Sequence, residues 1–201
     1  MLILLTVLLF LALFLLYSVL KIRFHSKPVS VRHDFSQLTG DAKRLFDHVH
    51  YLSSVIGPRS AVEYNRLNAT RGYIVSQLKS YGCNYELQNF KDGERMFSNI
   101  IVTLKGSRHP EEVVIIGAHY DTVIDTPGAD DNASAVALLL EMCRQLRGAR
   151  FSRTLKLIFF VLEEPPAFRS ELMGSYVYAK EAKARNENIT AMISLEMLGY
   201  Y

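Results

Sequence analysis

"EVVIIGAHYD", residues 112–121, runs from a stretch of apolar side chains directly into a histidine and an aspartate. A short continuous apolar run is typical of a strand that is buried on both faces of a parallel sheet. His119 and Asp121 come where this strand should end. The stretch therefore predicts a buried strand with polar, chemically useful side chains at its carboxyl end.

The same pattern continues toward the carboxyl terminus. A helix is expected over 134–146, a second buried strand in "TLKLIFFVL" (154–162), a helix over 171–185 and a third strand in "TAMISLEM" (190–197). Buried strands that alternate with helices predict a parallel sheet with right-handed crossovers and helices on both faces.

The residues before this unit predict two helices and a hairpin. Apolar spacing indicates helices over 36–55 and 61–81, the second preceded by a capping box of Ser60 and Glu63. "NYELQNF" (84–90) and "NIIVTLKG" (99–106) read as an antiparallel pair near a sheet edge. The predicted class is α/β, a three-layer α/β/α sandwich with a mostly parallel sheet.

Composition and the amino terminus set the domain organisation. The 201 residues are 49% hydrophobic and carry a dispersed net charge of +3, which suits a globular domain and argues against a nucleic-acid binder. The apolar run of residues 1–20 is long enough to cross a hydrocarbon core of roughly 30 Å. No basic residue precedes it and no small-residue cleavage site follows it, so it resembles an anchor more than a cleaved signal peptide. We expect an anchor at 1–22, a linker at 23–35 and a folded domain at 36–201.

Two features of the sequence favour opposite orientations of this single-pass anchor in the membrane. Lys21, Arg23 and Lys27 follow the apolar run, and the positive-inside rule would keep the domain cytoplasmic. Asn68-Ala-Thr and Asn188-Ile-Thr are glycosylation sequons and suit an exported domain. We expect the domain to be extracytoplasmic.

Charged side chains follow all three predicted parallel strands. His119 and Asp121 follow the first, Glu163 and Glu164 the second, and Glu196 lies near the end of the third. Each alone has an ordinary explanation as a solvated loop residue, and Asp130 to Asn132 alone could simply cap a helix. Ligand sites in such sheets form beyond the carboxyl ends of the strands, however, so the convergence predicts one site.

Imidazole and carboxylate ligands at one sheet edge favour two divalent metal ions over one. A bridging carboxylate can hold two metals roughly 3.5–4 Å apart, and Asp130 is the candidate bridge. Asp121 would orient His119 through its other ring nitrogen. Adjacent side chains diverge in an extended segment, so one of Glu163 and Glu164 should bind metal and the other should act as a base.

"VVIIGAHYDTV", "PGADDNASAVALLLEMCRQL", "FFVLEE", "ELMGSYVYAKE" and "SLEMLGYY" together resemble the successive signatures of the M28 family of zinc peptidases. The resemblance spans about residues 45–201 in the family's order. It implies a phosphorylase/hydrolase-like fold and an aminopeptidase that uses two Zn²⁺ ions and acts on peptide or protein N-termini. It also implies that Glu163 is the general base and that the zinc ligands are His119, Asp130, Glu164 and Glu196.

One departure from the family pattern leaves two alternatives open. The family takes a last histidine ligand from well beyond the fifth signature, whereas this chain stops at Tyr201. We therefore expect the C-terminal part of the fold to be missing and the peptidase domain to be incomplete. The alternatives are a single-zinc enzyme resembling glutaminyl cyclase, and a catalytically inactive, membrane-tethered binding domain.

Overall fold

The computed structural model describes residues 39–199. Within them, one five-stranded sheet has the strand order β1-β2-β4-β3-β5. Its strands are β1 (Glu86–Asp92), β2 (Arg95–Leu104), β3 (His109–His119), β4 (Arg153–Phe160) and β5 (Asn188–Ser194).

The pairing of these strands makes the sheet mixed. β3 is parallel to β4 and to β5, while β2 is antiparallel to β1 and to β4. The three parallel strands are the apolar runs that the sequence predicts, and β1 with β2 is the predicted edge hairpin. The third parallel strand, β5, was expected to be buried but is an edge strand with all of its residues exposed. The expected α/β class is confirmed.

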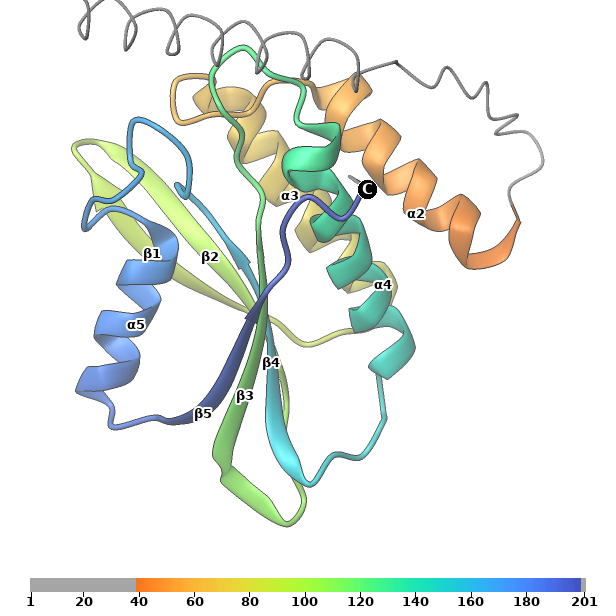
Figure 1. Cartoon of the computed structure of the whole chain (residues 1–201), viewed down its shortest axis with the longest axis vertical. Helices are drawn as coiled ribbons and strands as arrows, with labels where there is room; N and C mark the ends of the chain where they lie inside the picture. The colour runs from red at the N-terminus through yellow and green to blue at the C-terminus, as the bar shows by residue number, and fades with distance from the viewer. Residues whose placement is uncertain (1–38, 200–201) are drawn as a thin grey trace, which may run out of the picture. The chain divides into compact units, whose positions relative to one another are not determined.

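Helices cover both faces of the sheet (Figure 1). One face is packed against α2 (Gly40–His50), a wider helical turn at Tyr51–Ile56, α3 (Tyr64–Ser80) and α4 (Ala135–Leu146). The other face carries α5 (Gly174–Ala184), whose Tyr178 and Ala182 pack against apolar residues of β2, β3 and β4.

The helices α3 and α5 each begin three residues later than the sequence pattern predicts. α3 starts at Tyr64 instead of residue 61, because Glu63 Oε2 accepts the N–H of Ser60 at 3.0 Å and holds 60–63 in a turn. α5 starts at Gly174 instead of residue 171, since the N–H of Gly174 is bonded to Val161 O at 2.8 Å beside β4. Ser60 and Glu63 are therefore in contact as predicted, but they do not cap α3, which has no side-chain bond at its N-cap.

The proposed anchor (1–22) and linker (23–35) lie outside the described residues. Within residues 39–199, none of the helices combines the length and apolar character needed to span a membrane.

Candidate metal site

The parallel strands bring the predicted site residues to one edge of the sheet. His119 is the last residue of β3, Glu163 and Glu164 follow the end of β4, and Glu196 follows the end of β5. Parallel strands end at the same edge, so residues far apart in sequence become neighbours there. The convergence that the sequence predicts is present.

The imidazole of His119 is the centre of this group. Its Nε2 lies 3.0 Å from Asp131 Oδ1, 3.2 Å from Glu196 Oε2 and 3.8 Å from Glu164 Oε1. Ligand atoms of His119, Asp131 and Glu196 all lie within 4.8 Å of one another. One ring nitrogen among carboxylate oxygens is a donor set that suits zinc.

The carboxylate opposite His119 belongs to Asp131 and not to Asp130, the residue that the sequence motif indicates. Asp130 turns away: its Oδ1 accepts the N–H of Gly199 at 2.8 Å. Asp131 has φ −101° and ψ 94°, and both Asp131 and Asn132 depart from helical backbone angles at a kink in this turn. Adjacent side chains of an extended segment diverge, so only one of the two aspartates can face the imidazole. Asp131, and not Asp130, is therefore the aspartate beside the imidazole of His119.

Asn132 joins this loop to the segment after β5. It is fully buried, and its Nδ2 donates to Leu195 O and to Glu196 Oε2, each at 2.9 Å. Its Oδ1 accepts the N–H of Met197 at 3.3 Å. Asn132 thereby holds Glu196 toward His119, a role that the sequence interpretation as a turn-forming residue did not identify.

Asp121 has two functions at the edge. His119 Nδ1, the ring nitrogen opposite the other carboxylates, lies 3.2 Å from the main-chain O of Asp121 and 3.5 Å from its Oδ1. The carboxylate of Asp121 also accepts the N–H of Glu163 at 3.2 Å and that of Glu164 at 3.0 Å. Asp121 therefore connects the histidine with the segment that carries both glutamates.

The two glutamates point apart, as the sequence predicts. Glu164 faces His119, whereas Glu163 accepts the N–H and the hydroxyl of Ser175, both at 2.7 Å, in the first turn of α5. Burial raises the pKa of Glu163 above its ordinary value, and the bonds from Ser175 oppose this shift. A carboxylate with a raised pKa is better suited to accept a proton near neutral pH.

The pKa values of His119 and of Asp131 beside it depend on one another. Burial acts to lower the pKa of His119, but its contacts with Asp121, Asp131 and Glu196 outweigh burial and raise the pKa to about 12. The bond from His119 in turn lowers the pKa of Asp131. The carboxylates thus gather around a cation, and a divalent ion would satisfy the same group of oxygens after the imidazole loses its proton.

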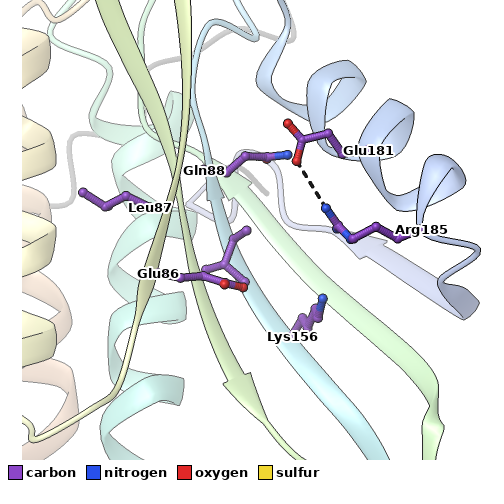
Figure 2. A pocket seen from close by; sticks show the side chains of 7 residues that line it. Glu86, Leu87, Gln88, Lys156, Glu181 and Arg185 are labelled. Carbon is purple, nitrogen blue, oxygen red and sulfur yellow. Dashed lines mark hydrogen bonds and ion pairs between the residues drawn. The ribbon is translucent and has the colours of Figure 1, made fainter.

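A separate pocket of about 430 Å³ lies between α5 and the face of the sheet (Figure 2). Its charged side chains are partly paired, with Arg185 Nη1 3.2 Å from Glu181 Oε2. None of the residues around His119 lines it. The lining residues are Glu86, Leu87, Gln88, Ile101, Lys156, Glu181 and Arg185.

Comparison with known proteins identifies relatives of the chain. The model of Peptidase family M28 matches residues 99–201. The uncharacterized protein YfbL of Escherichia coli (strain K12) is 38% identical over 161 residues, which cover 76% of this chain and 48% of YfbL. A probable zinc metalloprotease of Pyricularia oryzae is 30% identical over 193 residues, 86% of this chain and 36% of that protein. The chain thus spans about half of the first relative and about a third of the second.

A solved structure shares the fold. The zinc-dependent exopeptidase of Parabacteroides distasonis superposes with a TM-score of 0.62 at 23% identity, over 78% of this chain and 61% of that one.

Proposed function

The chain belongs to peptidase family M28, and we propose that it hydrolyses peptides with zinc as the cofactor. The observation that carries the proposal is the contact of His119 with Asp131 and Glu196 at the carboxyl edge of the parallel strands. The relative from Pyricularia oryzae named a probable zinc metalloprotease supports the choice of metal.

The ligands that we assign are His119, Asp131, Glu164 and Glu196. Zinc bound there would polarise a carbonyl group and lower the pKa of a water molecule. Asp121 holds the imidazole ring in orientation through Nδ1. We further propose two zinc ions per complete site, with Asp131 as the bridging carboxylate, because its two oxygens can each contact one ion.

Glu163 is the proposed general base. Its carboxylate is fixed by two bonds from Ser175 and does not contact His119, so it is free of the ligand group. It would accept the proton of the attacking water and deliver it to the leaving amine. The proposed substrates are peptides with a free N-terminus.

Glu163→Gln in the full zinc-loaded chain tests the proposal. General-base catalysis contributes at least about 100-fold, so hydrolysis of aminoacyl-arylamides and short peptides should fall by that factor while zinc content stays unchanged. Glu171→Gln is the matched control, because Glu171 lies in the same loop region, is exposed and pairs only with Lys180 at 3.5 Å. Equal activity of wild type and Glu163→Gln would reject the assignment.

The zinc-loaded wild-type chain also distinguishes a peptidase from the two alternatives, a glutaminyl cyclase-like enzyme and an inactive binding domain. Peptides with N-terminal glutamine would yield pyroglutamate if the site is a single-zinc cyclase. A protein that binds fewer than two zinc ions and has neither activity would fit the inactive binding domain. Zinc per chain, measured by elemental analysis, therefore accompanies both assays.

We also propose that residues 1–22 anchor the protein in a membrane with the domain on the extracytoplasmic side. The continuous apolar run supports the anchor. Asn188 of the sequon Asn188-Ile-Thr is exposed, whereas Thr70 of the sequon Asn68-Ala-Thr is fully buried. Protease accessibility in sealed vesicles, compared with a chain that lacks residues 1–22, tests both parts.

A further inference from the structure

Arg59 is fully buried, and its guanidinium group is bonded entirely to the main chain. Nε donates to Tyr120 O at 2.9 Å, Nη2 to Gly128 O at 2.9 Å and Nη1 to Pro127 O at 2.7 Å. Nη1 also lies 3.3 Å from Leu52 O. Burying an arginine is energetically unfavourable, because its charged group loses its hydration. Its retention in this interior calls for a specific role.

Three of the carbonyl groups that Arg59 binds, those of Tyr120, Pro127 and Gly128, belong to the two segments that form the metal site. Tyr120 directly follows His119, and Pro127 and Gly128 lead into Asp131. A rigid, planar group with several divergent donors can join separate backbone segments at fixed distances. Arg59 thus links the end of β3 to the loop that carries the opposing carboxylate.

The packing around the guanidinium leaves little freedom. Gly128 has φ +56°, and a Cβ there would lie 2.3 Å from both Asp131 O and Thr122 Cγ2 and 3.2 Å from Arg59 Nη2. The N–H of Arg59 donates to Thr122 Oγ1 at 3.0 Å, which attaches the backbone of this loop to the same segment. The link is therefore short and closely packed.

The charge of Arg59 also suits the site. Burial lowers the pKa of Arg59 to about 10, and the attraction of Asp121 and Asp131 opposes that shift. The group remains a cation at neutral pH. It therefore offsets part of the negative charge of the carboxylates without contacting them.

We infer that Arg59 is a positioning residue of the metal site: its bonds to Tyr120 O and Gly128 O set the separation of His119 and Asp131 and thereby the affinity for zinc. The inference rests on the zinc site of the proposed function. It does not require that peptides be the substrate, since it concerns metal binding alone.

Arg59→Lys in the full chain tests the inference, with zinc ion as the probe and chelator competition as the readout. A lysine ammonium group presents its three donors from one point and cannot bond to all of these carbonyls. We expect the zinc dissociation constant to rise at least about tenfold. Arg95→Lys is the matched control, because Arg95 Nη1 also donates to a carbonyl, Ala61 O at 2.9 Å, but outside the site.

A second readout separates positioning from a general structural role. Thermal unfolding is measured with chelator and with saturating zinc, and a positioning role reduces the rise in Tm that zinc produces. An equal loss of Tm in both conditions, with the zinc dissociation constant within twofold of wild type, would overturn the inference. So would an equal loss of affinity in Arg95→Lys.

Thr122→Val covers the case in which Arg59→Lys does not fold. It keeps the side-chain volume, removes the acceptor for the N–H of Arg59 and should weaken zinc binding in the same direction; unchanged affinity would then overturn the inference. A wild-type chain that binds zinc but hydrolyses no peptide would reject only the proposed function. A wild-type chain that binds no zinc would reject both.

Discussion

Asp121 Oδ2 accepts the N–H of Glu164 at 3.0 Å, so an aspartate after one strand determines where the backbone after the neighbouring strand lies. The same carboxylate lies 3.5 Å from His119 Nδ1 through Oδ1. One side chain therefore orients the histidine and places a proposed metal-binding glutamate. This double role makes Asp121 more than a support for the imidazole.

Asp121→Asn should weaken zinc binding by about 10- to 100-fold, the range found for residues that support metal ligands. The amide has one acceptor oxygen in place of two, so one of the two N–H groups loses its partner. The expected result is a higher zinc dissociation constant in chelator competition. Asp125→Asn, in the exposed part of the same loop, is the control and should bind zinc as wild type does.

Asp131→Asn and Asp130→Asn should differ strongly. Asp131 contacts His119 at 3.0 Å, whereas Asp130 is bonded to the N–H of Gly199. We expect Asp131→Asn to lower zinc affinity by more than about 100-fold, beyond the effect of losing a supporting residue, and Asp130→Asn to cost less. The reverse order in a zinc titration would return the bridging role to Asp130.

Ser175→Ala should change the pH dependence of catalysis. The hydroxyl of Ser175 donates to Glu163 Oε2 at 2.7 Å and lowers the pKa of that carboxyl group. Without this bond the pKa of Glu163 rises, and a base must be deprotonated to act. The acid limb of the kcat/KM profile should therefore move to higher pH. Ser170→Ala, which removes a hydroxyl from the preceding loop, should leave the limb in place.

His48→Gln should reduce the sensitivity of the fold to acid. His48 is buried between α2 and α3, with Nδ1 2.6 Å from Tyr73 Oη, Nε2 3.0 Å from Tyr81 Oη and Glu141 Oε1 at 3.8 Å from Nε2. Burial lowers the pKa of His48 despite the opposing charge of Glu141. The unfolded chain then takes up a proton at a higher pH than the folded chain does.

The free energy of unfolding should consequently fall as the pH drops below about 6.5, by at most about 1.4 kcal/mol per pH unit for this one group. Urea denaturation of the chelator-treated chain at pH 7.5, 6.5 and 5.5 measures the slope. The free energy of unfolding of His48→Gln should depend less steeply on pH than that of wild type. His109 is exposed, so His109→Gln should show the same pH dependence as wild type. Identical slopes for all three proteins would contradict the prediction.

The amino-acid sequence by itself determined the succession of strands and helices along the chain, because the spacing of apolar residues differs between the two kinds of element. It also predicted that His119, one of Glu163 and Glu164, and Glu196 would meet, since parallel strands end at one edge. It further predicted that the side chains of Glu163 and Glu164 point in different directions, because adjacent side chains diverge in an extended segment. These conclusions require only the local pattern of apolar and polar residues and the shared direction of the parallel strands.

Tertiary structure decided which of Asp130 and Asp131 faces the histidine, because that depends on the backbone angles of one turn. It also decided the partners of Arg59 and Asn132, whose bonds cross to segments more than 60 positions away in sequence. Such contacts carry no periodic signal. They arise only when the packed sheet edge brings separate loops within hydrogen-bond distance, and they determine how firmly the proposed metal ligands are held.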